Sequence, residues 1–513
     1  MTQSLTRRDS YWGVSRDFPT RTSWTAKRVR AVRAPRVREL LSVRGLSADL
    51  LLVVGYVLLS RAFIGDEAKL GIKLGPVPLF VTDGVLLILV ALSLHRRAGR
   101  VLQWTFGGAG AGEPGRALWV LFVISVLYCA LAIDRYGIMA VHDLAMFGYC
   151  IFFPLVYFAL STRAMAVKVI RYFIYGACLG AIWFEFQTLS GIQLVDLYEI
   201  DLSVAGHGLV TRLSAGNLGA DLGPALAGLF AYFVTEREHY WFHGAALLLG
   251  LITLLQLMDR TSLLGFTAAA GVMFILGVGK ARPYSLVMFL GLVLLLLLSV
   301  ETDLPIPGAT RLQSVWQGLS SGANYENDPD AQFRLRRWRS TISVWMTNPV
   351  FGVGFGAPIQ LDTWGTANGA KGAAMRGGLG AFNVGMPHNS FLVVLARTGV
   401  IGLSLICYAW FGGILRIVRR IRRRAADADQ IASAVALIAM ILTAALNLFF
   451  ERPMLCAPFW ILLAASYKLS HSTGRPVAAR ANPAFARNGQ FSTNQPMVGP
   501  QARLGGAWQA RWK

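Results

Sequence analysis

Long apolar stretches recur along most of the chain, and they restrict its possible folds more than any other feature. A helix that crosses a bilayer core needs roughly 20 apolar residues, and fewer suffice where flanking side chains reach the interface. We expect twelve such helices, at 48–64, 79–95, 117–133, 144–160, 169–190, 218–235, 242–258, 262–278, 284–300, 390–415, 431–449 and 454–468. Because 55% of the 513 residues are hydrophobic and only 15% are charged, the sequence predicts an all-α polytopic membrane protein.

The basic residues set the expected orientation, because Lys and Arg are enriched in short cytoplasmic loops. The segment 1–47 is rich in arginine, and with twelve helices the basic loops near 96–116, 163–168, 280–282 and 416–424 fall on the same side. We therefore expect both termini in the cytoplasm. A formal charge of +22 would suggest nucleic acid for a soluble protein, but here the charge flanks apolar runs. Membrane lipids with anionic headgroups are the expected partner, and nucleic acid is not.

Three regions follow from this pattern. Residues 1–47 are predicted to form a basic disordered cytoplasmic tail, 48–468 the membrane domain, and 469–513 a second disordered cytoplasmic tail rich in Gly, Pro, Asn, Gln and Arg. One large outer loop, 301–389, lies between the ninth and tenth predicted helices. Within it, 333–346 has the pattern of an amphipathic helix, whereas 351–386 is rich in glycine and is expected to be irregular.

Three side chains on the predicted outer side are candidates for chemistry. His388 ends the large loop immediately before a span, where an imidazole is suited to general-base catalysis near neutral pH; a structural loop histidine is the alternative. Arg212 precedes the sixth span, and Arg260 lies in the tight turn before the eighth. A guanidinium can bind two oxygens of a diphosphate at once. The alternatives are a lipid headgroup contact for Arg212 and an ion pair with Asp259 for Arg260.

Two further features need an explanation. Arg334 and Trp338 are spaced to share one face of the amphipathic helix, where they could bind a sugar, although a solvated helix face is equally compatible. Glu185 lies inside the fifth predicted span, and a carboxyl group within a membrane is by default a functional-site hypothesis.

Four blocks of sequence, taken in order, are similar to the signature of the O-antigen ligase and polymerase superfamily. They occupy 334–338, 348–356, 388–392 and 398–403, and the segments around Arg212 and Arg260 also resemble that family. The resemblance extends over roughly 50–468. Two departures stand out: Asp259 precedes Arg260 where serine is usual, and Arg397 occupies a position where an acidic residue is common.

The resemblance implies a metal-independent, inverting glycosyltransferase without a cofactor, in the inner membrane of a bacterium. Its donor would be an oligosaccharide on undecaprenyl diphosphate, bound at the periplasmic face. By the same resemblance, His388 would deprotonate the acceptor hydroxyl, and Arg212 and Arg260 would bind the diphosphate leaving group. Arg334, Trp338 and Asn389 would shape the substrate site.

Several functions fit that family. A polymerase joins repeat units in exopolysaccharide or lipopolysaccharide biosynthesis, and a chain-length regulator is then a candidate partner; a ligase transfers the finished glycan to lipid A core. We favour the polymerase slightly, because no feature of the sequence marks a lipid A acceptor. A protein O-glycosyl ligase is a third member class. A transporter or flippase with an intramembrane Glu185 is the alternative from another class, but the lack of an internal repeat and the large outer loop disfavour it.

Overall fold

A computed structural model describes residues 47–62, 72–74, 77–106, 112–190, 192, 198–204, 208–214, 218–236, 239–257, 259–278, 283, 287, 291, 329–357, 359, 387–447 and 449–471. All of them belong to one compact unit, Val43–Lys513. Nearly all of the predicted tails 1–47 and 469–513, and most of the loop 301–389, lie outside the described residues, so the predicted domain boundaries stay predictions.

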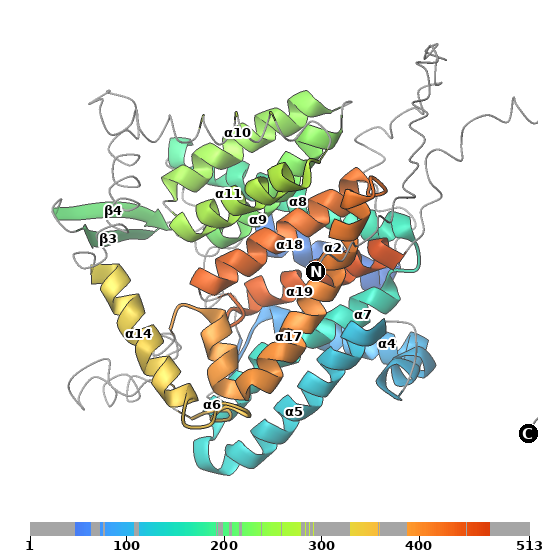
Figure 1. Cartoon of the computed structure of the whole chain (residues 1–513), viewed down its shortest axis with the longest axis vertical. Helices are drawn as coiled ribbons and strands as arrows, with labels where there is room; N and C mark the ends of the chain where they lie inside the picture. Colours follow the sequence, from blue (N-terminus) through green and yellow to red (C-terminus); the bar gives the residue numbers. More distant parts are fainter. Residues whose placement is uncertain are drawn as a thin grey trace, which may run out of the picture. The chain divides into compact units, whose positions relative to one another are not determined.

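The described part of the chain is predominantly helical (Figure 1). In chain order, the helices are α2 (Ala48–Ala62), α4 (Val81–Phe106), α5 (Gly112–Tyr136), α6 (Ile138–Gly148), the 3-10 helix η1 (Tyr149–Ile151), α7 (Phe152–Ala159), α8 (Arg163–Ser190), α9 (Leu218–Thr235), α10 (Tyr240–Gln256), α11 (Arg260–Leu276), α14 (Pro329–Trp345), α17 (Ser390–Arg422), α18 (Ala428–Leu446) and α19 (Pro453–His471).

Six helical segments in the described residues are long and apolar enough to cross a membrane. They are Pro114–Tyr136, Ile138–Ala159, Arg163–Ser190, Leu218–Thr235, Ser390–Arg422 and Ala428–Leu446, and shorter apolar helices lie at Val81–His95, Tyr240–Gln256 and Thr261–Leu276. The prediction of a helical, multi-pass membrane protein is therefore confirmed. Each predicted run except the ninth coincides with a described helix; the run 284–300 lies almost wholly outside the described residues, and the count of twelve stays a prediction.

Two short antiparallel hairpins accompany the helices of the predicted all-α fold. Strand β1 (Ile72–Leu74) pairs with β2 (Val77–Leu79), and β3 (Tyr198–Val204) pairs with β4 (Gly208–Ser214). The sequence of β3 alternates apolar and polar residues, which is the two-residue period of a strand. A search for runs long enough to cross a membrane does not detect such short segments.

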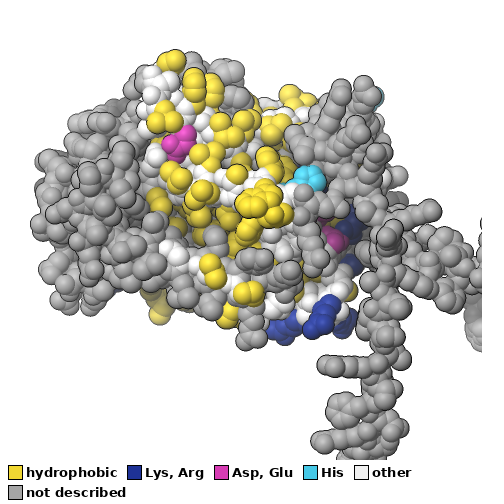
Figure 2. Space-filling model, turned by 90° about the horizontal axis from the view of Figure 1, so that it is seen from above, with side chains coloured by type: hydrophobic (Ala, Val, Ile, Leu, Met, Phe, Trp, Pro, Cys, Tyr) yellow, Lys and Arg dark blue, Asp and Glu magenta, His cyan; other side chains and the backbone are white. Residues whose placement is uncertain are grey.

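Helix α9 lies at the centre of the packing. It contacts α8, α10, α11 and α18, and nearly all of its side chains are buried. Buried apolar residues of the other helices extend this core towards α17 and α19. Helices that are apolar on their outer side as well are expected where lipid is the solvent. In agreement, Figure 2 shows a face of the unit on which hydrophobic side chains predominate.

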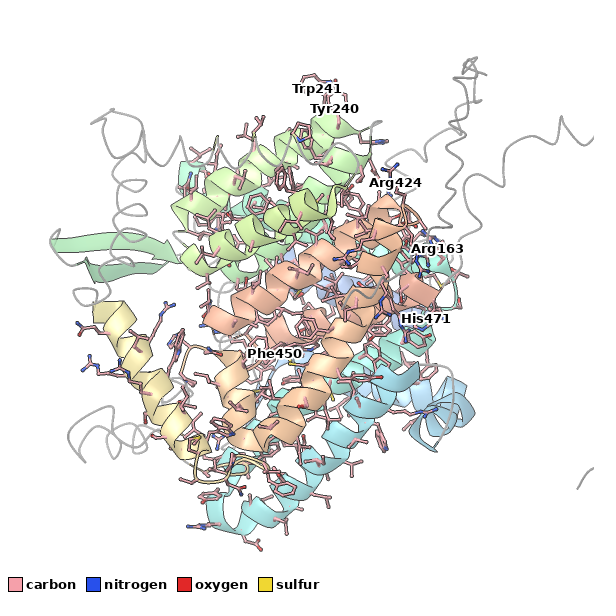
Figure 3. The ribbon with its side chains drawn as sticks, viewed as in Figure 1. Arg163, Tyr240, Trp241, Arg424, Phe450 and His471 are labelled. Carbon is pink, nitrogen blue, oxygen red and sulfur yellow. The ribbon has the colours of Figure 1, made fainter. Side chains whose placement is uncertain are left out.

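The two ends of the helices are distinguished by the elements that begin and finish there. At one end, which we call the basic end, α8 and α18 begin and α17 and α19 finish, with Arg163, Arg419, Arg420, Arg422 and Lys468. Arg163 pairs there with Asp427, and Figure 3 shows Arg163, Arg424 and His471 on that side. The opposite end, where α9, α11, α17 and α19 begin, is called the His388 end. α14 lies at the His388 end (Figure 1).

Candidate functional site

His388 lies in the last turn of chain before α17, and its backbone is unusual. Its φ is 51°, in the left-handed region that few residues other than glycine adopt, although histidine enters it more often than most. The next residue, Asn389, caps α17: its side-chain oxygen accepts the backbone N–H of Leu392 at 3.1 Å. The helix start therefore holds the His388 backbone in a strained conformation, which is common in functional sites. The His388 side chain is half-buried.

Helix α14 contacts the turn that contains His388, because the side chains of Arg334 and Trp338 both point from α14 towards the helical unit. The indole Nε1 of Trp338 donates to the carbonyl of Pro387 at 2.7 Å, and Arg334 Nη1 donates to the carbonyl of Leu446, the last residue of α18, at 3.3 Å. The predicted sharing of one helix face is confirmed. Both side chains bind backbone carbonyls that flank the His388 turn, and binding of a sugar stays a prediction.

Ser390, the first residue of α17, joins the turn to the loop between α18 and α19. Its hydroxyl lies 2.6 Å from Glu451 Oε2 and 3.2 Å from the carbonyl of Asn447, and it accepts the backbone N–H groups of Phe449 (2.9 Å) and Phe450 (3.2 Å). A hydroxyl has one proton to donate, and the short distance favours Glu451 as its acceptor. The side chain of Ser390 is fully buried, so this network fixes the position of His388 relative to α18 and α19.

Glu451 is a titratable group beside the turn that the sequence analysis did not assign. Burial raises the pKa of its carboxyl group from 4.5 to about 7, against the opposing effects of the Ser390 hydrogen bond and nearby Arg452. Its second oxygen, Oε1, is buried and has no hydrogen-bond partner among the described residues. A carboxyl with these properties changes protonation state near neutral pH, where a histidine base also works.

The start of α11 is connected to the same network. Asp259 caps this helix: its Oδ1 accepts the backbone N–H groups of Thr261 at 3.1 Å and Ser262 at 3.2 Å, and the Thr261 hydroxyl at 2.7 Å. Asn447 Nδ2 then donates to Thr261 Oγ1 at 3.4 Å. Asn447 thus lies between Thr261, which follows Arg260 at the start of α11, and Ser390, two residues after His388. The side chain of Arg260 lies outside the described part of the structure.

Arg212 lies on β4, opposite Ile200 of β3. Its side chain is likewise outside the described part. Strand β4 ends four residues before α9 begins, and the second residue of α9, Gly219, lies against the Asp259 cap: a Cβ at Gly219 would come 2.6 Å from Asp259 Oδ2. The strand that carries Arg212 is therefore followed in sequence by a helix whose start contacts the start of α11. How near the guanidinium of Arg212 comes to His388 stays a prediction.

Arg397 and Asp143 form a buried ion pair between α17 and α6. Arg397 Nη2 lies 2.9 Å from Asp143 Oδ2, and both side chains are buried. Arg397 also binds the carbonyls of Gly354 and Ala357, while Asp143 accepts the backbone N–H of Gly356 at 2.6 Å. Arg397, one of the two positions at which the sequence departs from the family pattern, thus binds the glycine-rich segment. That segment is irregular over 351–357, as predicted, with positive φ at three glycines.

Glu185 has local partners on α10: Thr253 Oγ1 donates to it at 2.7 Å and Gln256 Nε2 at 3.3 Å. Sequence reasoning missed the roles of Glu451 and Asp143. For Asp143, the available signal was an acid at the edge of one predicted span and an arginine, Arg397, inside another, since isolated charges in spans require partners. For Glu451 no such signal existed, because its burial depends on the packing of the α18–α19 loop.

The fold and the site together define a polytopic helical membrane protein in which His388, Arg334 and Trp338 lie at one end of the helices. Residues 245–407 match the family model described as O-antigen ligase. This match confirms the resemblance to the O-antigen ligase and polymerase superfamily, and it indicates a membrane enzyme of O-antigen ligase or polymerase type. The matched segment includes Arg260, Arg334, Trp338 and His388, and it excludes Arg212 and Glu451. No curated protein matches the chain.

Proposed function

We propose that this protein is a glycosyltransferase that transfers or polymerises glycan carried on undecaprenyl diphosphate, at the periplasmic face of a bacterial inner membrane. The main support is the position of Asn447, whose Nδ2 donates to Thr261 Oγ1 and whose carbonyl oxygen lies 3.2 Å from the Ser390 hydroxyl, because this residue lies between the helix start that carries Arg260 and the turn that carries His388. A base and a cation on separate helices can serve one reaction only if the two helices are held at a fixed distance and orientation.

In this mechanism His388 accepts the proton of the acceptor hydroxyl as that oxygen attacks the anomeric carbon of the donor. The bond from the anomeric carbon to the diphosphate oxygen breaks, and undecaprenyl diphosphate leaves with the bonding electron pair. Arg212 and Arg260 stabilise the charge that develops on the leaving group. A direct displacement inverts the anomeric configuration. Asn389 and Trp338 hold the turn that presents His388, and Arg334 holds the adjoining end of α18.

Among the members of the superfamily we favour a polymerase over a ligase for lipid A core. A deletion strain separates the two on a gel of surface glycans. Single repeat units still attached to their acceptor indicate a polymerase, whereas unattached polymer indicates a ligase. Loss of sugar from pilin-like or secreted proteins indicates a protein O-glycosyl ligase.

The same strain tests the site when complemented with variants. His388→Ala should abolish the polymer or ligated glycan while the protein accumulates normally in the membrane on an immunoblot. Arg212→Ala and Arg260→Ala should each reduce turnover by about 10²-fold if each stabilises the leaving group. Wild-type glycan from the His388→Ala strain would refute the assignment of the base.

A further inference from the structure

The face of α14 that points away from the helical unit differs from the face that braces His388. Arg337, Thr341 and Val344 are buried on the inner side. Exposed residues repeat every three or four positions on the opposite side, namely Arg336, Arg339, Ile342, Ser343 and Met346. This outer face has two arginines in its first half and apolar side chains in its second half, of which Met346 is 61% exposed.

The turn after α14 continues the apolar half of this face. Phe351 is 56% exposed, and Val350 is also exposed, although the backbone there is firmly held. Val400 and Ile401 of α17 donate their N–H groups to the carbonyls of Pro349 (3.0 Å) and Val350 (3.4 Å). Val350 and Phe351 therefore expose apolar side chains from a backbone that is held by hydrogen bonds, which is unusual for a turn in contact with water.

The neighbouring helix α5 indicates that lipid covers the exposed apolar side chains of this turn. The hydroxyl of Tyr128, on the candidate span α5, donates to the carbonyl of Phe351 at 2.7 Å. On the same helix Leu127 and Leu131 are exposed, the latter by 83%. Side chains of this kind on a membrane-crossing helix face lipid. Since Phe351 touches α5 beside them, the same bilayer reaches the turn.

We propose that the outer face of α14 and the turn after it form an interfacial anchor in the lipid leaflet nearest His388. Ile342, Met346, Val350 and Phe351 enter the acyl-chain boundary, and Arg336 and Arg339 bind the phosphates of anionic lipids. Arginine stems can lie along apolar surface while their guanidinium groups stay at headgroup depth. Through the bond from Trp338 to Pro387, the anchor would set the depth of His388 at the membrane surface. Only this last step rests on the proposed function.

Nitroxide labels on the full-length protein test the anchor in vesicles of phosphatidylethanolamine and phosphatidylglycerol. Cysteine is introduced at Met346 or Phe351, in a Cys407→Ser background because Cys407 is the native cysteine that is not fully buried. Leu131→Cys is the lipid reference, and Arg424→Cys, exposed at the basic end, is the water reference. We expect labels at Met346 and Phe351 to collide with oxygen more than with a nickel chelate, at a depth of roughly 5–10 Å.

If the labels at Met346 and Phe351 collide with the nickel chelate as readily as the label at Arg424 does, the proposed anchor is overturned. The arginines are tested by the double variant Arg336→Gln, Arg339→Gln, which should make the Met346 label shallower without moving the Leu131 label. An unchanged depth at Met346 would overturn phosphate binding by these arginines. Because neither measurement requires turnover, failure of the anchor is distinguishable from failure of the proposed glycosyl transfer.

Discussion

The Glu451→Gln variant should lose the pH dependence that its buried carboxyl imposes on the stability of the folded protein. Burial raises the pKa of this group from 4.5 to about 7. Between those values the folded state retains a proton that the unfolded chain releases, so the free energy of unfolding decreases as pH rises and levels off above the folded pKa. Each pKa unit is worth about 1.4 kcal/mol, so the loss amounts to about 3 kcal/mol, since the carboxyl oxygen Oε1 is buried.

The assay is thermal unfolding of the purified protein in detergent, followed by circular dichroism between about pH 5 and about pH 8. Near pH 5 the wild type and Glu451→Gln should melt at similar temperatures, because a neutral carboxylic acid and an amide can both accept the Ser390 hydrogen bond. Near pH 8 the variant should melt at a higher temperature than the wild type. Asp134→Asn is the matched control, since Asp134 is an exposed acid at the His388 end of α5. Parallel profiles of the wild type and Glu451→Gln would refute the assignment of a raised pKa to Glu451.

Three further substitutions test the packing around the site, the first two by the same melts and the third by folded yield. Arg397→Ala should destabilise the protein by about 3–5 kcal/mol because it leaves the buried Asp143 without its partner, and Asp143→Asn added to it should restore part of that loss. Ser390→Ala should cost about 1–3 kcal/mol, since it removes a buried hydroxyl from four polar neighbours; a neutral effect would contradict the role of that network. Gly399→Ala should reduce the folded yield, because Gly399 interrupts the helical backbone of α17 with a φ of 64° and a new Cβ would collide with the carbonyl oxygen of Val350; normal yield would show that this interruption can relax.

The sequence was sufficient to locate the helices, because an apolar run long enough to span a bilayer has few alternative structures. The amphipathic helix at 333–346 was also predictable, and α14 occupies Pro329–Trp345. The hairpin β3–β4 was not predicted, since a seven-residue alternation is weak beside the much longer apolar runs that flank it.

The site was predictable only in part. His388 could be selected because it immediately precedes a span, and Arg334 and Trp338 because their spacing places them on one face of the amphipathic helix; the family signature added Asn389. The contacts that hold them were not predictable, because Ser390 and Glu451 are separated by 61 residues in the chain and meet only when α18 and α19 pack against α17. Likewise, the burial that raises the pKa of Glu451 is a property of the packed loop and leaves no trace in local sequence.

The central claim, that His388 is the base of a transfer from a lipid-linked donor, is tested most directly by replacing its imidazole without disturbing its backbone. Asparagine adopts positive φ readily, so His388→Asn should preserve the turn at φ 51°. The measurement is the rate at which the purified, reconstituted protein releases undecaprenyl diphosphate from a lipid-linked oligosaccharide. We expect a loss of at least about 10²-fold in the variant with an unchanged melting temperature. A variant that releases undecaprenyl diphosphate at the wild-type rate would contradict the claim.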